Sequence, residues 1–203
     1  MLDENFSVYL NSKYRHAIGE QETKNTLIEP FFKELGYDIS HTEDIMTEVT
    51  CDIGKNNEKV DYILCIAGQP KILVEAKDWR VELSIKHINQ LFRYFSTSDC
   101  KLGILTNGLE YWFFSDFEKE NVMDKKPFYK INALSICDKD KFILNAICKV
   151  QQCAYPIEKF IIEQKTRLLM KDKEKLSKII ALTYFNNLNN ADAVYNGLRN
   201  DIK

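Results

Sequence analysis

Two carboxylates and one lysine lie where charge is costly, at the ends of apolar segments. Asp61 lies in the apolar run 60–66 (VDYILCI), and the next run, 71–76 (KILVEA), contains Glu75 and directly precedes Lys77. The AGQP segment between the runs contains the Gly and Pro of a tight turn, so we expect a hairpin with largely buried strands. Asp61 and Glu75 are equally distant from the middle of that turn, which should place the three charged side chains on one face at its open end.

This combination of charges suits metal-assisted hydrolysis of a phosphodiester. Two carboxylates held close together repel each other, and burial raises the free energy of their charged forms. A divalent cation resolves that conflict, and hard oxygen ligands favour Mg²⁺, with Mn²⁺ as a substitute. Lys77 is placed to orient the attacking water and to offset charge on the phosphate. The alternative, a surface ion pair of Glu75 and Lys77, fits poorly with the buried strand before them.

The segments around the hairpin predict an α/β protein. Apolar residues recur at helical spacing over 20–35, Gly36 ends that pattern, and Pro30 inside it should bend the helix or leave a hydrogen bond unmade. A mixture of Val, Thr, Cys and Ile predicts a strand at 48–53 before a polar turn at 54–59. Further along we expect a helix at 82–96, strands at 101–106 and 110–115 joined by a type I′ turn at Asn107-Gly108, an edge strand at 128–131, and helices from about residue 139 onward.

Composition and missing motifs exclude several other classes of protein. The formal net charge is −2, so a nucleic-acid partner would need a local basic patch rather than a basic protein. The chain contains no run of 18 apolar residues and no secretory signal, so we expect no membrane span. It contains neither GxSxG nor GxxxxGK[ST], which argues against a serine hydrolase and a nucleoside triphosphatase of the P-loop kind. The cysteines form no CxxC pair, so we expect reduced thiols in a cytoplasmic protein.

The same residues also resemble a known family. Asp61 followed by Glu75-Ala76-Lys77 resembles the D…ExK core of the PD-(D/E)xK nuclease superfamily, although Val60 stands where Pro is common. More narrowly, the chain is similar to the N-terminal nuclease domain of type I restriction enzyme R subunits and its stand-alone relatives. That family carries a pattern close to E-x-x-T-[RK]-x-x-L-I-x-P-x-x-x-x-x-G-[WY] in its opening helix and often QxxxY after the ExK strand. The matching residues here are Glu20 to Lys24, Leu27 to Pro30, Gly36-Tyr37 and Gln90 to Tyr94.

The resemblance, which extends over about residues 20–114, implies a fold and a metal site. The expected fold is a restriction-endonuclease-like core of α-β-β-β-α-β order, with a mixed central sheet flanked by helices and a C-terminal helical extension. The implied Mg²⁺ ligands are Asp61, Glu75, the main-chain carbonyl of Ala76 and Glu20. Glu22 is an alternative to Glu20 as the helix carboxylate, and acids at a helix N-terminus are also favoured by the macrodipole alone.

The remaining site residues are expected around this metal site. Gln90 would join Asp61, Glu75, Lys77 and Glu20 in catalysis by contacting phosphate or Lys77, and Tyr94 shares its helix face. The resemblance implies DNA as the substrate. The residues expected to contact it are Lys24, Arg80, Lys86, Arg93 and Tyr94.

We expect a nuclease-like domain at 1–135 and a helical extension at 136–203 that packs on it or mediates contact with a second copy or a partner subunit. A helicase follows the nuclease in the R subunits, and we expect none in these 203 residues. The leading hypothesis is a Mg²⁺-dependent deoxyribonuclease in restriction or phage-related DNA metabolism that uses no nucleoside triphosphate. The alternative is a catalytically silent module that binds DNA or a partner in a restriction or defence complex, and an RNA substrate also stays open.

Overall fold

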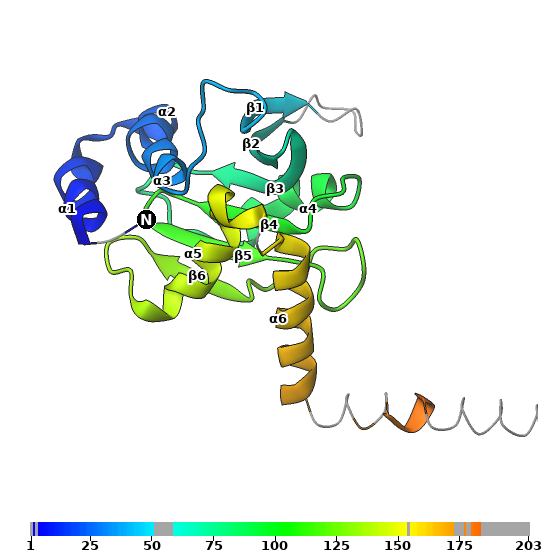
Figure 1. The fold of residues 1–203 in the computed structure, drawn as a ribbon. Coiled ribbons are helices and arrows are strands. Elements are labelled where there is room, and N and C mark those ends of the chain that lie inside the picture. Colours follow the sequence, from blue (N-terminus) through cyan, green and yellow to red (C-terminus); the bar gives the residue numbers. More distant parts are fainter. Residues whose placement is uncertain are drawn as a thin grey trace, which may run out of the picture. The chain divides into compact units, whose positions relative to one another are not determined.

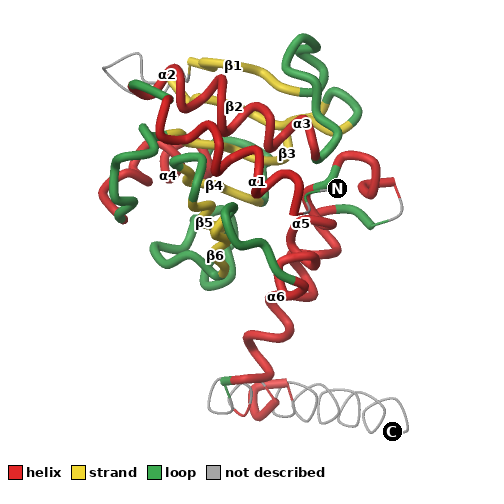
Figure 2. Tube along the Cα trace, turned by 90° about the vertical axis from the view of Figure 1, so that its left-hand side faces the viewer, coloured by secondary structure: helices red, strands yellow, loops and turns green. Residues whose placement is uncertain are grey.

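A computed structural model describes residues 2, 4–50, 59–153, 155–172, 177 and 180–183. Within these residues, six strands form one mixed sheet whose spatial order equals their order in the sequence (Figures 1 and 2). β3 and β4 are parallel, and every other neighbouring pair is antiparallel. The strands are β1 (Ile45–Thr50), β2 (Lys59–Ile66), β3 (Gln69–Ala76), β4 (Leu102–Thr106), β5 (Glu110–Phe114) and β6 (Tyr129–Asn132).

Helices cover both faces of this sheet because its strands are apolar on both faces. One core cluster joins alternate strand residues to the N-terminal helices, α5 and the start of α6, and the other joins the opposite strand residues to α4. The α-helices are α1 (Glu4–Lys13), α2 (Gly19–Thr23), α3 (Glu29–Glu34), α4 (Asn89–Phe95), α5 (Lys141–Ile147) and α6 (Ile157–Lys171). The other helical segments are η1 (Tyr14–His16), η2 (Lys24–Ile28), η3 (Ile85–Ile88), η4 (Asp138–Asp140) and η5 (Lys149–Cys153).

The predicted fold class is confirmed, with an α-β-β-β-α-β order from α2 to β4 followed by the two predicted strands β5 and β6. α4 is shorter than the predicted helix at 82–96, since the chain enters it through the 3-10 segment η3, which Ser84 caps. β1 begins earlier than the strand predicted at 48–53. Residues 51–53 of that strand, the polar turn up to residue 58 and most of the helices predicted beyond residue 172 lie outside the described residues.

The predicted type I′ turn at Asn107-Gly108 is wrong. Thr106 pairs with Tyr111, which leaves a four-residue loop, and Asn107 does not have the positive φ that this turn requires. Its side-chain Oδ1 instead accepts hydrogen bonds from the main-chain N–H groups of Leu109 (3.1 Å) and Glu110 (2.8 Å). An Asn side chain that accepts from its own loop offers the chain an alternative to the two-residue turn.

Pro30 reshapes the helix that precedes the sheet, as its position predicts. Helical residues run without a break from Gly19 to Glu34, but the five residues before Glu29 form the π-helical turn η2. Pro30 has no N–H to donate to the carbonyl of Thr26, and its ring crowds that carbonyl. The hydroxyl of Tyr9 in α1 donates to it instead, at 3.0 Å. Gly36 then ends the helix with a φ of 90°.

The chain divides into two compact units, 1–161 and 162–203. α5 and the buried residues Ile157, Phe160 and Ile161 of α6 belong to the core of the first unit. The predicted boundary between 135 and 136 therefore falls before segments that pack on the sheet, and the role of the extension in a partner contact stays a prediction. In the part of the chain that the structure describes, no helix has the length and apolar character to cross a membrane.

Tyr9→Phe tests the account of the π turn. We expect it to lower the free energy of unfolding by about 1 kcal/mol, because the Thr26 carbonyl loses its donor in a half-buried position. Urea denaturation monitored by circular dichroism measures this change. Tyr14→Phe is the matched control, since the Tyr14 hydroxyl accepts only an exposed bond from Arg15. Equal stabilities of the two variants would contradict the assignment.

Candidate active site

The hairpin of β2 and β3 brings Asp61 and Glu75 to the same end of the sheet. Tyr62 pairs with Val74, and Asp61 and Glu75 are the next residues on the two strands. The turn itself contains only Ala67 and Gly68, both with positive φ, and a bulge after Leu64 shifts the register by one residue. This bulge compensates for the shorter turn, so the predicted pairing holds at the functional end.

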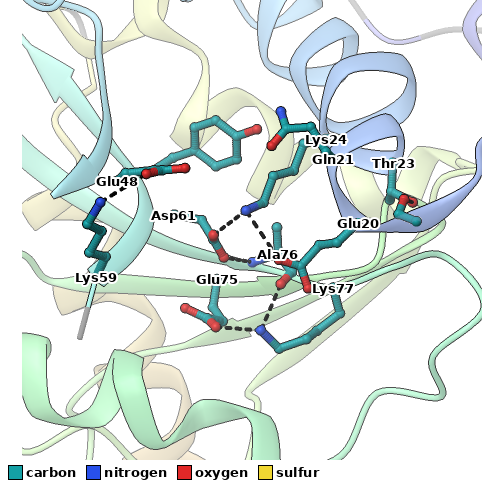
Figure 3. A network of polar contacts seen from close by, with 12 residues as sticks. Glu20, Gln21, Thr23, Lys24, Glu48, Lys59, Asp61, Glu75, Ala76 and Lys77 are labelled. Atoms are coloured by element: carbon teal, nitrogen blue, oxygen red, sulfur yellow. Dashed lines mark hydrogen bonds and ion pairs between the residues drawn. The ribbon is translucent and has the colours of Figure 1, made fainter. Parts of the chain in front are cut away.

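Glu75 is a carboxylate almost removed from solvent. It lies on a central strand between β2 and β4, with 2% of its surface exposed. Burial and the nearby charge of Asp61 raise its pKa to about 7, although contact with Lys77 acts in the opposite direction. Its Oε1 accepts a hydrogen bond from Lys77 Nζ at 2.5 Å (Figure 3). Its Oε2 is buried and has no hydrogen-bond partner among the described residues.

Asp61 is held from two sides. Its Oδ2 accepts a hydrogen bond from the main-chain N–H of Ala76 at 2.7 Å, and its Oδ1 contacts the ammonium of Lys24 (Figure 3). Lys24 is the first residue of the π turn η2, so the helix that precedes the sheet brings a positive charge to Asp61, near the start of β2. Burial would lower the pKa of Lys24, but its contacts with Asp61 and Glu20 prevail and raise it.

The helix α2 carries two candidate carboxylates for this cluster, Glu20 and Glu22, and their contacts in the structure differ. Glu20 Oε1 lies 3.2 Å from the Nζ of Lys24 and so joins the network around Asp61. Glu22 accepts a hydrogen bond from the main-chain N–H of Ile18 at the start of its own helix. The geometry therefore favours Glu20 as the helix carboxylate and gives Glu22 a capping role.

Lys77 bridges two oxygen atoms that were predicted to hold a metal. Its Nζ donates to Glu75 Oε1 and, at 2.9 Å, to the carbonyl of Ala76 (Figure 3). Its own main-chain N–H donates to the carbonyl of Thr106 at 2.8 Å, which fixes the chain where it leaves β3. The ammonium therefore contacts a carboxylate and a carbonyl oxygen, both of which are ligands for hard cations.

The donor set fits a divalent cation that keeps several waters. Across the described residues there is no group of three or more His, Cys, Asp or Glu side chains that could hold a metal ion. Asp61, Glu75 and the Ala76 carbonyl nonetheless supply oxygen donors at one end of the hairpin, and the unpartnered Oε2 of Glu75 is a buried acceptor that a cation would satisfy. Mg²⁺ is commonly bound through one or two carboxylates with waters and substrate phosphates.

Gln90 and Tyr94 contact the β1–β2 hairpin rather than Lys77. Gln90 Nε2 donates to the carbonyl of Lys59 at 3.2 Å, and the Tyr94 hydroxyl donates to the carbonyl of Val49 at 2.6 Å. These two carbonyls lie on the facing strands β1 and β2, and Lys59 is two residues from Asp61. The contacts assign both side chains to positioning the strand that carries Asp61, and a phosphate contact by Gln90 stays a prediction.

The predicted DNA-contacting residues occupy different surroundings. Lys24 is buried in its contacts with Asp61 and Glu20, so its ammonium is already engaged. Arg80 forms a bidentate pair with Asp78, with Nε at 2.9 Å and Nη2 at 2.5 Å. Lys86 and Arg93 are exposed on η3 and α4. The structure therefore leaves Lys86 and Arg93 at the surface and places Lys24 inside the site.

Asn107 and Thr23 hold the segment after Lys77 in place, a role that the sequence patterns did not indicate. Asn107 Nδ2 donates to the carbonyls of Trp79 (3.3 Å) and Val81 (3.0 Å). The hydroxyl of Thr23 accepts from the main-chain N–H of Trp79 at 3.2 Å. A Cβ on Gly108 would lie 2.7 Å from the side chain of Leu27, so the loop and the helix approach closely. Asn107-Gly108 is the sequence signal for this loop, although the pattern by itself predicts a two-residue hairpin turn.

Glu75→Gln tests the burial of this carboxylate through the pH dependence of stability. The folded protein holds a proton on Glu75 more tightly than the unfolded chain does, because the pKa of this carboxyl in the unfolded chain lies near 4.5. The contribution of Glu75 to the free energy of unfolding is therefore largest below that value and is lost as the pH rises through about 7. In EDTA we expect Glu75→Gln to gain about 2.5 kcal/mol relative to the original protein between pH 5 and pH 8. A difference that does not change with pH in urea denaturation would contradict this account.

Tyr94→Phe tests the contact between α4 and the hairpin. Loss of the bond to the Val49 carbonyl should speed amide hydrogen exchange in β1 and β2 and lower the free energy of unfolding by about 1 kcal/mol. Hydrogen exchange followed by mass spectrometry locates the effect. Exchange that increases only within α4 would show that Tyr94 does not support these strands.

Comparison with known proteins identifies the family. The family model for the type I restriction enzyme R protein N terminus (HSDR_N) matches residues 19–128, which span α2 to the loop before β6. No curated protein and no solved structure matches the chain significantly. The matched segment exceeds half of the chain and contains Glu20, Lys24, Asp61, Glu75 and Lys77. The chain therefore belongs to the family of type I restriction enzyme R protein N-terminal domains, and its fold is consistent with the PD-(D/E)xK nuclease superfamily.

Proposed function

We propose that this chain is a metal-dependent nuclease that hydrolyses phosphodiester bonds of DNA. The observation that carries the proposal is the buried carboxylate of Glu75, whose Oε2 lacks a partner among the described residues while Asp61 and Lys77 lie beside it. A protein that used this end of the hairpin only for structure would gain stability from an apolar residue in its place. Membership of a restriction-enzyme family supports DNA as the substrate.

Asp61 and Glu75 would hold a divalent cation together with the carbonyl of Ala76, and Glu20 would lie at the edge of the site. The cation, when bound, supplies a Lewis acid for the phosphate and for the attacking water. Glu75 must release its proton to serve as a ligand, and the positive charges of Lys77 and a cation both favour that release. We infer Mg²⁺ as the natural ion, with Mn²⁺ as a substitute, because all the available donors are oxygen atoms.

Lys77 would orient water and stabilise charge on the phosphate. Its ammonium is already directed to Glu75 and to the Ala76 carbonyl, and 20% of its side-chain surface is exposed, so it lies at the boundary between the buried carboxylate and solvent. An ammonium at this boundary can exchange one of its hydrogen bonds for a phosphate oxygen or a water. The side chain then offsets negative charge as the phosphorus–oxygen bond breaks.

Cleavage assays test the proposal. Purified protein is incubated with linear and circular double-stranded DNA, single-stranded DNA and RNA, each with Mg²⁺, Mn²⁺ or EDTA. We expect cleavage of DNA only with a divalent cation, and losses of about 100-fold or more in Glu75→Ala and Lys77→Ala. Glu43→Ala, which removes an exposed carboxylate from the loop before β1, should retain full activity.

Three outcomes would change the conclusion. An absence of cleavage with every metal, together with no metal-induced rise in melting temperature, would contradict the enzyme proposal. Metal-independent DNA binding without cleavage would favour the silent binding module instead. Cleavage of RNA alone would keep the chemistry and change the substrate.

A further inference from the structure

Lys24 places a positive charge between two of the carboxylates predicted to hold metal. Its Nζ contacts Asp61 Oδ1 and lies 3.2 Å from Glu20 Oε1 (Figure 3). Only 11% of the Lys24 side chain and 15% of the Asp61 side chain are exposed, so the pair is screened little by solvent. The ammonium of Lys24 thus lies between Glu20 and Asp61, where a metal ion shared by these two carboxylates would otherwise bind.

The fold holds this ammonium in place. Lys24 is the first residue of the π turn that Pro30 imposes and Tyr9 supports, and the same turn carries the buried Leu27 against Gly108. Burying a lysine is costly unless carboxylates pair with it, and here two do. π turns inside α-helices frequently lie at functional sites. The backbone of the π turn therefore fixes the position of Lys24, and its side chain does not behave like that of an exposed surface lysine.

On the Glu75 side of the site, in contrast, one carboxylate oxygen is left without a positive partner among the described residues. Glu75 Oε2 is a buried acceptor without a partner among the described residues, and Glu75 Oε1 and the Ala76 carbonyl accept hydrogen bonds from Lys77, an ammonium that borders solvent. Asp61 accepts one bond at each oxygen and also keeps lone pairs. The acceptor that needs a positive charge is therefore Glu75 Oε2. On the other side of the site, Lys24 already pairs with Glu20 and Asp61.

The charge balance agrees with this division. When Asp61, Glu75 and Glu20 are all ionised, as metal binding requires of a ligand, they face the two ammoniums of Lys24 and Lys77, which leaves one net negative charge. One divalent cation and one singly charged phosphodiester bring the total to zero. A second divalent cation would leave two uncompensated positive charges in a poorly solvated site, which is unfavourable.

We propose that the site takes one divalent cation, on the side of Glu75, and that the ammonium of Lys24 supplies the charge of a second one between Asp61 and Glu20. This inference rests on the proposed metal-dependent function. It assigns Lys24 a role in fixing metal stoichiometry and in positioning Asp61, in place of a direct contact with DNA.

Counting bound Mn²⁺ tests the proposal without relying on activity. Electron paramagnetic resonance of free Mn²⁺ during a titration gives the number of ions bound per chain, and we expect one for the original protein. In Lys24→Gln, which removes the charge and leaves a polar side chain one atom shorter, we expect a second ion between Asp61 and Glu20. Lys24→Arg should keep one ion, and Lys24→Gln with Glu20→Gln should return to one. Lys33→Gln, which removes an exposed lysine from α3, is the matched control and should also bind one.

The outcomes separate this proposal from the function on which it rests. Two ions on the original protein would overturn the single-cation proposal and leave the nuclease function standing, whereas no bound ion would overturn both. One ion on a Lys24→Gln variant that circular dichroism shows to be folded would overturn the role of Lys24. The count on the original protein decides the stoichiometry even if a variant does not fold.

Discussion

The rest of the structure is arranged around a carboxylate that is held away from water at the end of a central strand. Glu75 lies on β3 between β2 and β4 with almost no exposed surface, and this burial is the largest cause of its raised pKa. Such a group is tolerated only if nearby charge can stabilise its ionised form. Lys77 contributes part of that charge, while the Oε2 of Glu75 has no hydrogen-bond partner among the described residues.

Each neighbouring element limits how far this site can move. α2 and the π turn deliver Lys24 to Asp61, and α4 holds the β1–β2 hairpin through Gln90 and Tyr94. The loop after β4 anchors the segment beyond Lys77 through Asn107. Elements far apart in the sequence therefore meet at a single end of the hairpin, and the residues that make these contacts lie within the segment that the family model matches.

The sequence was sufficient for features that depend on local pattern. The structure contains the strands that apolar runs of strand length predicted and the helix whose Pro and Gly positions marked its bend and its end. It also contains the strand pairing that the spacing of Asp61 and Glu75 predicted. The pairing held because a bulge after Leu64 offsets a turn that is shorter than assumed, and a bulge leaves little trace in a single sequence. Tertiary contacts decided what the patterns could not, such as the loop at Asn107 and the burial of Lys24.

The contrast between Lys24 and Lys77 shows why a charge pattern alone does not assign roles. Both are lysines near a carboxylate, yet one lies within a helix whose hydrogen-bonding pattern fixes its position, and the other follows a strand and borders solvent. Rigid placement suits a charge that remains in place through a reaction, because no reorganisation is needed when a substrate arrives. A partly exposed ammonium suits a group that exchanges partners. The backbone around each lysine, more than its identity, therefore distinguishes a charge held in fixed contacts from one that is able to exchange partners.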